Sequence, residues 1–408
     1  MDIWLIDHYA VPPSYYPLAR QTNFAKYLIR MGHSVKIFAA SSVHNSDENL
    51  IKGKELYKEL VVDGITYVII KCKQYKGNGL QRILNMLEFA YKLPRVCAKY
   101  KVPDAIVSTS MTPFACAKGI KIAKKYGCKN IAQISDLWPE TLVAYGVASP
   151  KNPAVLFLRR LEKWMYKSAD RIVFTMEGAY DYIIEQGWEK VIPRKKVFCI
   201  NNGVDLELYK YNCQNYIVED KDLLDKSIIK VIYAGSVRGV NNLGLLLDVA
   251  KEMTDPRIVF LIWGTGDEKE LLEKRVSDEG IKNVKFKGFV EKKFIPYITS
   301  CADLNFAHNM ATPLFRFGIS FNKIFDYLAS GKPVISDFPC KYNPAIMMGA
   351  GVGVEEPTAK NVAQAIENFF KMEKSEYDQY CENARRAAIK YDFKQLTKEL
   401  LNVIERAE

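Results

Sequence analysis

Short apolar runs rich in β-branched residues alternate with amphipathic stretches along the whole chain. Each run is short enough for a strand buried on both faces, and most neighbouring runs leave room for a crossover helix, which is typical of a parallel sheet covered by helices. The strands that this pattern predicts are Ile3–Ile6, Val35–Ala39, Thr66–Ile70, Ala105–Val107, Asn130–Ile134, Arg171–Phe174, Val197–Ile200, Ile228–Ala234, Arg257–Trp263, Val284–Phe286 and Pro333–Ser336. In the second half the predicted helices are Leu243–Met253, Glu268–Glu279, Asn322–Ser330, Thr358–Lys371 and Ser375–Lys390.

The alternation breaks once, in a polar stretch between residues 202 and 226. A chain of 408 residues is also longer than the roughly 250–300 residues at which single cores stop growing. We therefore expect an α/β protein with two Rossmann-like domains, the first covering residues 1–205. Ligands of doubly wound sheets bind outside the carboxyl ends of the strands, so we expect the functional site in a cleft between these domains.

Composition excludes several classes of protein. The chain is 49% hydrophobic and 26% charged, close to the globular averages of roughly 45–50% and 25%, which excludes disordered and collagen-like chains. Its nine cysteines are scattered without a CxxC pair, which favours reduced thiols over a disulfide framework or a zinc site. Neither a signal-peptide pattern nor an apolar run of about 18 residues is present, so we expect a soluble or peripheral protein.

The net charge of +11 is concentrated in one part of the sequence. Residues 1–200 hold 30 basic and 17 acidic residues, whereas residues 201–408 hold 28 and 30. Residues 71–129 contain 13 basic residues but only Glu88 and Asp104 on the acidic side. Such a block suggests an anionic partner, either nucleic acid, anionic lipid or a phosphate-bearing substrate. A solvated lysine-rich surface is the alternative.

Residues 318–335, GISFNKIFDYLASGKPVI, carry the most informative pattern. Ser320 or Asn322 is expected to cap a helix whose first turn offers free N–H groups to an anion. Lys323 in that turn opposes the helix dipole and is therefore better explained by an anionic ligand. Asp326, three residues on, could accept hydrogen bonds from ribose hydroxyl groups. The alternative is an ordinary capped amphipathic helix.

This segment resembles the loop–helix element S-P-x-K-x-x-E-Y-x-A-x-G-K-P-V-I with which family 4 retaining glycosyltransferases of the GT-B fold bind a nucleotide sugar. The resemblance implies that Asp326 holds the ribose, and that Lys323 holds the diphosphate with the backbone from Ile319 to Asn322. Two departures are Gly318 in place of the first family glutamate and an aspartate in place of the second. The matched residues are Ser320, Lys323, Asp326, Tyr327, Ala329, Gly331, Lys332, Pro333, Val334 and Ile335.

Two glycine-rich turns extend the resemblance. The first follows Tyr233 and places Ser236 and Asn241 where the family usually carries an arginine and a lysine. Arg238 is the only cation in this loop, and we expect it to neutralise the leaving diphosphate. The second turn, Trp263–Asp267, resembles the family's G-x-G-x-E/D element beneath the nucleobase. The glycines expected at the donor are Gly235, Gly264 and Gly266.

In the first half, Ile134–Glu140 resembles the D-L-W-P-E segment of a branch that includes N-acetyl-L-fucosamine transferases of surface-polysaccharide assembly. Asp136, as a catalytic residue, and Glu140 could orient an acceptor hydroxyl group. Alternatively, Asp136 caps a helix and Trp138 belongs to the core.

The opening DHYAVPP, with Arg20 further on, resembles the same branch and implies that His8 and Arg20 bind the acceptor. Residues 14–17, Ser-Tyr-Tyr-Pro, replace the glycines that the branch carries there. A structural role for His8 is the alternative.

Residues 71–102 predict a basic amphipathic helix that Pro94 kinks or divides. Such a helix can lie in a membrane interface, or it can simply pack on the sheet with a wet basic face. Branch members use polyprenyl-linked acceptors, and this implies docking of residues 71–102 on an anionic membrane surface.

The resemblance implies the overall activity: transfer, with retention, of a sugar from a nucleotide diphospho-sugar, with UDP expected, to a polyprenyl-diphosphate-linked saccharide. We expect a place in bacterial surface-polysaccharide or glycan biosynthesis, on the cytoplasmic face of the cell membrane. It also implies a nucleotide-sugar-binding domain over residues 206–385 and a helix over 386–408 that returns to the first domain.

No cofactor or metal is expected, because the only D-x-D spacing, Asp220 to Asp222, lies in the polar stretch and is expected to be solvated. A nucleotide-sugar 2-epimerase of the same fold is the first alternative. A nucleic-acid-binding protein is the second, and it lacks both interleaved aromatic residues and a recognition module.

Overall fold

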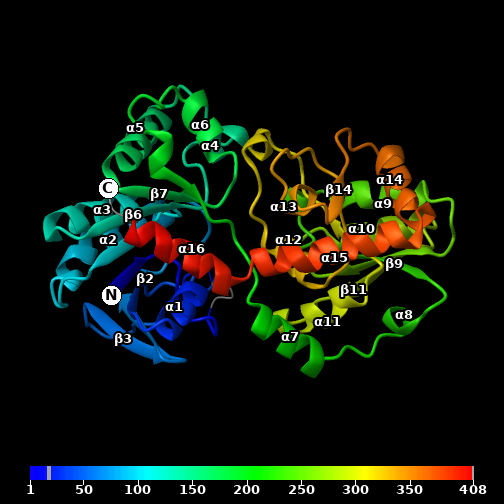
Figure 1. Cartoon of the computed structure of the whole chain (residues 1–408), viewed down its shortest axis with the longest axis horizontal. Coiled ribbons are helices and arrows are strands. Elements are labelled where there is room, and N and C mark those ends of the chain that lie inside the picture. The colour runs from blue at the N-terminus through cyan, green and yellow to red at the C-terminus, as the bar shows by residue number, and fades with distance from the viewer. Residues whose placement is uncertain (16–19, 407–408) are drawn as a thin grey trace. The chain divides into compact units, whose positions relative to one another are not determined.

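The computed structural model of the chain describes residues 1–15 and 20–406. These residues form two compact units: unit 1 comprises Met1–Asn201 with Phe393–Glu408, and unit 2 comprises Asn202–Asp392 (Figure 1). The sequence analysis placed the corresponding boundaries after residues 205 and 385. Tyr16 and Pro17, which belong to the segment that replaces the branch's glycines, lie outside the described residues.

Unit 1 is built on an eight-stranded sheet with the order β3-β4-β2-β1-β5-β6-β7-β8. Neighbouring strands are parallel except β3 and β4, which are antiparallel. The strands are β1 (Asp2–Ile6), β2 (Ser34–Ala40), β3 (Tyr57–Val62), β4 (Ile65–Ile70), β5 (Ala105–Thr109), β6 (Lys129–Ile134), β7 (Arg171–Phe174) and β8 (Val197–Cys199). The helices are α1 (Arg20–Arg30), α2 (Leu80–Cys97), α3 (Pro113–Tyr126), α4 (Glu140–Ala144), α5 (Pro153–Ser168), α6 (Ala179–Glu185) and α16 (Phe393–Glu405).

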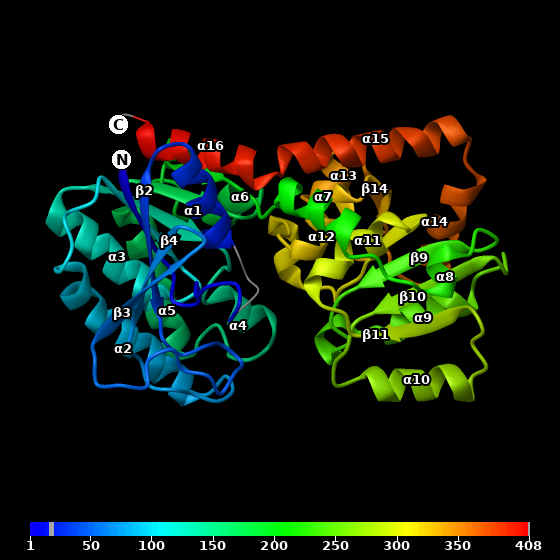
Figure 2. The same ribbon diagram turned by 90° about the horizontal axis from the view of Figure 1, so that it is seen from below.

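Local signals explain where these helices begin and end. The first position of α3 is Pro113, and Gly127 ends the helix with a φ of 67°, in the left-handed region that favours glycine. Asn152 caps α5 by accepting a hydrogen bond from the backbone N–H of Ala154. Helices α2, α3 and α5 lie side by side, whereas α16 packs along α1 (Figure 2). The expected return of the C-terminal helix to the first domain is thereby confirmed, and the rings of Phe24 and Phe393 meet there with centroids 5.5 Å apart.

Unit 2 contains a six-stranded, entirely parallel sheet with the order β11-β10-β9-β12-β13-β14. Its strands are β9 (Ile229–Ala234), β10 (Ile258–Trp263), β11 (Val284–Gly288), β12 (Leu304–Ala307), β13 (Val334–Ser336) and β14 (Gly351–Gly353). Its helices are α7 (Leu206–Asn215), α8 (Lys221–Leu224), α9 (Gly244–Lys251), α10 (Lys269–Asp278), α11 (Ile295–Ser300), α12 (Asn322–Ala329), α13 (Pro344–Met347), α14 (Ala359–Lys371) and α15 (Lys374–Lys390). Two parallel-sheet domains confirm the predicted α/β class.

Three local features refine the expectations from the sequence. Pro94 does not divide α2, which runs unbroken to Cys97, because a proline in the last turn disturbs few helical hydrogen bonds. The polar stretch after residue 202 contains helices α7 and α8. Asp220 and Asp222 are not simply solvated: Asp220 caps α8 and its carboxylate lies 2.7 Å from the Lys287 Nζ, while Asp222 is buried and pairs with both Lys285 and Lys287.

Candidate functional site

The candidate donor residues of unit 2 surround the start of α12. The N-cap of this helix is Phe321, and no side chain caps it, so the expectation that Ser320 or Asn322 does so was wrong. The Ser320 hydroxyl group and carbonyl instead accept hydrogen bonds from the backbone and side chain of Asn202, at 3.1 and 2.9 Å. Because no side chain occupies the cap, the first N–H groups of α12 stay available to an anion. Asn322 is exposed at this end, and Ile319 is buried just before it.

Lys323 lies in the first turn of α12, with its ammonium group held in place. Its Nζ donates to the carbonyl oxygen of His308 at 3.1 Å and to the hydroxyl group of Tyr233 at 3.3 Å, and it lies 4.7 Å from the centroid of the Tyr233 ring. Burial lowers the pKa of Lys323 to about 8. Two effects disfavour the charged form of Lys323: its loss of solvation and its position at the positive end of the helix dipole. A bound anion would offset both.

Asp326 follows one turn later on α12 and is half-buried. Within the described residues its carboxylate accepts no hydrogen bond from a side chain or backbone group, and burial raises its pKa. A carboxylate in this state can accept hydrogen bonds from ligand hydroxyl groups.

The glycine-rich turns after β9 and β10 are packed directly on each other. The backbone N–H of Gly235 donates to the Trp263 carbonyl at 2.9 Å. A Cβ atom at Gly264, whose φ is 145°, would lie 1.8 Å from the carbonyl oxygen of Gly235, and one at Gly266 would lie 1.9 Å from that of Val237. Only glycine permits this approach. Arg238 in the same loop is exposed and forms no ion pair in the described part of the chain.

In unit 1, His8 lies two residues after the end of β1 and is 1% exposed. Its ring contacts those of Tyr9 and Phe89 edge-on, with centroids 4.7 and 5.0 Å away. Neither ring nitrogen makes a hydrogen bond of normal geometry with the described residues. Burial lowers the pKa of His8 to about 3, so the ring is neutral near neutral pH.

The other predicted residues of unit 1 have different surroundings. Arg20 donates to the carbonyl oxygens of Ile200 and Asn201 at 2.8 and 2.7 Å, which ties α1 to the segment after β8. Glu140, the first residue of α4, pairs with Arg159 at 2.7 Å. Asp136 does not cap α4, whose N-cap is Pro139.

Arg82 is a residue that the sequence analysis assigned to the membrane-facing helix and not to the site. Its Nε donates to the Tyr9 hydroxyl group at 2.8 Å, and its guanidinium lies 5.4 Å from the centroid of that ring. Loss of solvation raises the pKa of the Asp136 carboxyl group, and the Arg82 charge opposes this rise. Arg82 is a cation in the first turn of a helix, so the signal that singled out Lys323 could have found it.

Helix α2 also presents apolar side chains to solvent. Leu80 and Tyr91 are 70% and 63% exposed, and Ile83, Leu84 and Leu87 are exposed as well. No helix in the described part of the chain is long and apolar enough to cross a membrane. Over the same residues, no group of three or more His, Cys, Asp or Glu side chains is placed to hold a metal ion.

Two parallel-sheet domains with candidate residues at the carboxyl ends of their strands define the GT-B architecture. Residues 21–208 match the model of Glycosyltransferase Family 4, and residues 218–387 match that of Glycosyl transferases group 1. Matched in both halves, the chain belongs to the family 4 glycosyltransferases, which use nucleotide sugars. It is 23% identical over 278 residues to WcaI of Escherichia coli (strain K12), whose name assigns it to colanic acid biosynthesis as a glycosyl transferase. That match spans 65% of this chain and 66% of the relative, so this chain matches just under two thirds of the relative's length.

Solved structures share the fold over the whole chain. Anabaena Alr3699/HepE in complex with UDP and glucose matches with a TM-score of 0.67 at 16% identity, covering 100% of both chains. An E. coli trehalose-6-phosphate protein bound with UDP-2-fluoro glucose matches with a TM-score of 0.73 at 11% identity, again covering 100% of both. Sucrose-phosphate synthase from Thermosynechococcus elongatus matches with a TM-score of 0.67 at 16% identity, over 99% and 98% of the two chains.

Proposed function

We propose that this glycosyltransferase moves a sugar from a UDP-sugar to a hydroxyl group of a polyprenyl-diphosphate-linked saccharide, with retention and without a metal. The observation that carries the donor half is the position of Lys323, a half-buried cation in the uncapped first turn of α12. The UDP ligands of the related structures support UDP as the nucleotide. The name of WcaI supports a role in surface-polysaccharide or glycan biosynthesis.

In this proposal the donor residues stabilise the leaving group. Breaking the bond between the anomeric carbon and the diphosphate oxygen leaves negative charge on UDP. Lys323, Arg238 and the free N–H groups at the start of α12 offset this charge, and such stabilisation is the largest contribution in many enzymes. Asp326 accepts hydrogen bonds from the ribose. Ser320, Ile319 and the three loop glycines shape the backbone around the nucleotide, and Asn322 belongs to the same helix start.

The acceptor residues in this proposal lie in unit 1. Asp136 is exposed just after β6 and orients the attacking hydroxyl group. His8, which is neutral and whose ring nitrogens make no hydrogen bond of normal geometry with the described residues, can bind a hydroxyl group of the acceptor. Glu140 and Arg20 are further acceptor residues, and the contacts described above mean that each would act while also supporting the fold.

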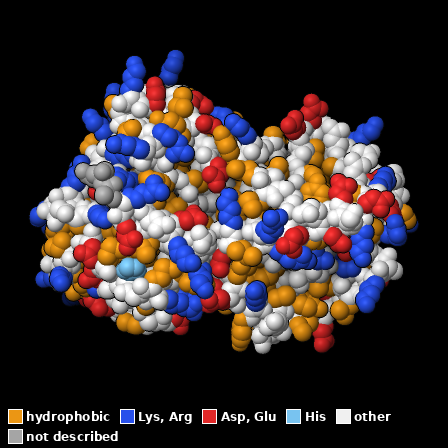
Figure 3. All heavy atoms as spheres, viewed as in Figure 1, with side chains coloured by type: hydrophobic (Ala, Val, Ile, Leu, Met, Phe, Trp, Pro, Cys, Tyr) orange, Lys and Arg blue, Asp and Glu red, His pale blue; other side chains and the backbone are white. Residues whose placement is uncertain are grey.

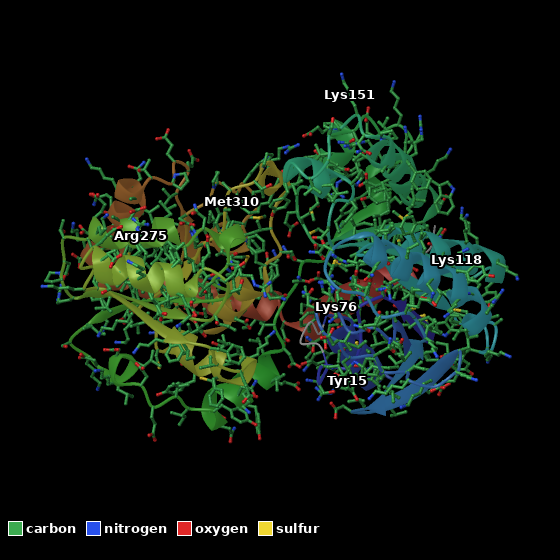
Figure 4. The ribbon with its side chains drawn as sticks, turned by 180° about the vertical axis from the view of Figure 1, so that it is seen from behind. Tyr15, Lys76, Lys118, Lys151, Arg275 and Met310 are labelled. Atoms are coloured by element: carbon green, nitrogen blue, oxygen red, sulfur yellow. The ribbon has the colours of Figure 1, made fainter. Side chains whose placement is uncertain are left out.

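The acceptor's lipid chain requires a membrane nearby, and we propose that residues 71–102 dock on the anionic cytoplasmic face of the cell membrane. The exposed apolar residues of α2 support this, because a helix with basic flanks and a wet apolar face suits a lipid interface. Basic side chains of the same unit, Lys76 and Lys151 among them, project into solvent (Figure 4).

A thermal-shift series with UDP, GDP, ADP and uridine tests the donor half. At equal concentrations the ligand with the lowest Kd stabilises the native state most, by about 2.7 kcal/mol when it is present at 100 times its Kd. UDP should therefore raise the melting temperature more than the other ligands. Equal shifts with all diphosphates would contradict UDP as the nucleotide. Conversion of a UDP-sugar into its epimer without any acceptor would instead indicate a 2-epimerase.

Co-sedimentation with phosphatidylglycerol vesicles and with neutral phosphatidylcholine vesicles tests the membrane half. Leu84→Glu on α2 should reduce binding to the anionic vesicles. Leu271→Glu is the matched control, since Leu271 is also an exposed leucine of a helix, α10 of unit 2, and should leave binding unchanged. Equal binding to both kinds of vesicle, unaffected by Leu84→Glu, would contradict membrane docking.

A further inference from the structure

His308 is buried at the carboxyl end of β12, and the sequence offered no partner for it. The register of the sheet explains its surroundings: β12 and β13 are parallel with Ala307 opposite Ser336, so the next residues, His308 and Asp337, lie side by side. The His308 Nδ1 is hydrogen-bonded to the Asp337 carboxylate, and both side chains are 2% exposed. The ring also stacks on Phe306, with centroids 5.9 Å apart and planes at 17°.

The second ring nitrogen of His308 reaches the loop that carries Arg238. Its Nε2 lies 2.8 Å from the carbonyl oxygen of Asn242. A carbonyl oxygen only accepts, so Nε2 must be the donor. Asn242 itself has a φ of 48° and ends the short 3₁₀-helix Gly239–Asn241. The hydrogen bond therefore fixes the far end of the loop at a residue in the sparsely populated left-handed region.

The backbone of His308 reaches the other cation. Its carbonyl oxygen accepts the 3.1 Å hydrogen bond from the Lys323 ammonium group. One residue thus contacts both cationic elements of the candidate donor site: its ring contacts the Arg238 loop, and its carbonyl group contacts Lys323. Asp337 holds the ring in the orientation that this requires.

We propose that His308, oriented by Asp337, is a positioning residue that sets the spacing between the Arg238 loop and the Lys323 ammonium group for a diphosphate. This inference rests on the proposed donor function. His308 touches no part of the substrate in this role, and its effect reaches the diphosphate through Arg238 and Lys323. The role therefore predicts a selective loss: the contribution of the phosphates to binding should fall, and that of the nucleoside should not.

The test compares UDP with uridine by calorimetric titration of wild type and His308→Phe, which keeps a ring against Phe306 and loses both ring hydrogen bonds. UDP affinity should fall about tenfold, a typical size for coupled neighbours, while uridine affinity stays the same. Tyr377→Phe is the matched control, because it removes a hydrogen bond to the Asp303 carbonyl at the opposite end of β12 and should change neither affinity.

A double-mutant cycle separates positioning from general damage. If His308 acts through the loop, Arg238→Ala combined with His308→Phe should weaken UDP little more than the stronger single change. Should His308→Phe fold poorly, His308→Gln tests the same point, since it keeps a polar side chain but loses the rigid ring that joins Asp337 to Asn242. Equal losses for UDP and uridine, or an unchanged UDP affinity, would overturn the positioning role. Absence of UDP binding by the wild-type protein would instead contradict the proposed donor function.

Discussion

The carboxyl ends of the two sheets differ in how completely the chain satisfies its own polar groups. In unit 2 the loops bind one another: Gly235 donates to Trp263, and the His308 ring joins Asn242 to Asp337. In unit 1, buried polar groups at the ends of β1 and β6 have no protein partner within the described residues, including both ring nitrogens of His8 and the side-chain amide of Gln133. Unit 2 contains such groups as well, at the Nε1 of Trp263 and the Oδ1 of Asp337, but fewer of them than unit 1 within the described residues. Unit 1 therefore keeps more hydrogen-bonding capacity for a ligand or for water.

The two units also differ in charge. The net excess of basic residues lies in the first half of the sequence, and the second half is nearly balanced. Figure 3 shows many Lys and Arg side chains on the visible face of unit 1, with acidic side chains among them, and a mixture of both kinds over unit 2. In unit 2 several cations are paired within the unit, such as Arg275 with Asp248 and Glu279.

The largest expected effect comes from Lys323→Ala, which removes the best-placed cation of unit 2. Loss of one preorganised group that stabilises transition-state charge costs about 10²–10³ in rate, so kcat/KM with the donor should fall by that factor. Lys274→Ala is the control, because among the described residues Lys274 pairs with Asp278 alone, on the exposed side of α10. Turnover by Lys323→Ala within tenfold of wild type, at verified donor saturation, would remove Lys323 from the site.

The contrast between Lys323 and His308 shows what the sequence can and cannot reveal. A lysine in the first turn of a helix conflicts with local helix physics, so the sequence alone marks Lys323 as a candidate site residue. His308 has no local signal, because its partners Asp337 and Asn242 are 29 and 66 residues away and meet it only through the order of the strands.

The same distinction between local signals and long-range partners applies to the fold. The long parallel strands were predicted from their apolar runs. Strand β3 was missed because it is an antiparallel edge strand with half-buried or exposed residues. Strand β12 was missed because Asn305 interrupts its apolar run, and β14 because two of its three residues are glycine, which is depleted in strands. Register and strand order are long-range properties that no single stretch of sequence states.

Asp326 allows ribose contacts to be separated from phosphate contacts, because it is the one residue of α12 expected to bind the ribose and not the phosphates. Asp326→Ala should weaken UDP by about 10- to 100-fold, the range for hydrogen bonds to a charged group, and should leave pyrophosphate binding unchanged. The preference of wild type for UDP over 2′-deoxy-UDP should shrink in the variant. Calorimetric titration with the three ligands distinguishes this from a general loss of the site, which would weaken pyrophosphate as well.

His8 tests the other side of the comparison through pH. Burial lowers its pKa from 6.5 to about 3, so between these values the unfolded chain binds a proton that the folded chain does not. The free energy of unfolding contributed by His8 therefore falls as pH drops below 6.5, by up to about 1.4 kcal/mol per pH unit. His8→Phe should lose this acid sensitivity and unfold at a higher temperature than wild type at pH 4.5, with a smaller difference at pH 7.5.

His33→Phe is the control, since His33 is not fully buried and the pKa of its ring is lowered less strongly. Parallel pH profiles of wild type and His8→Phe would show that His8 is not held neutral by the fold.

The smallest expected effect concerns the basic surface that distinguishes unit 1. Lys92 and Arg95 are poor choices for a test, because Lys92 pairs with Glu88 and Arg95 donates to the Tyr91 hydroxyl group, so changing them would also disturb α2. Lys99 and Lys101 are exposed and make no ion pair in the described part of the chain.

Each basic residue near an anionic bilayer contributes about 1 kcal/mol, so Lys99→Glu should weaken binding to phosphatidylglycerol vesicles by at least about fivefold, and by more if the new carboxylate is repelled. The matched change Lys282→Glu, at an exposed lysine of unit 2, should leave binding to these vesicles unchanged if unit 1 alone docks on the membrane. Equal losses from both changes would mean that the vesicles respond to net charge alone, and the contrast between the two units would then carry no information about where the membrane binds.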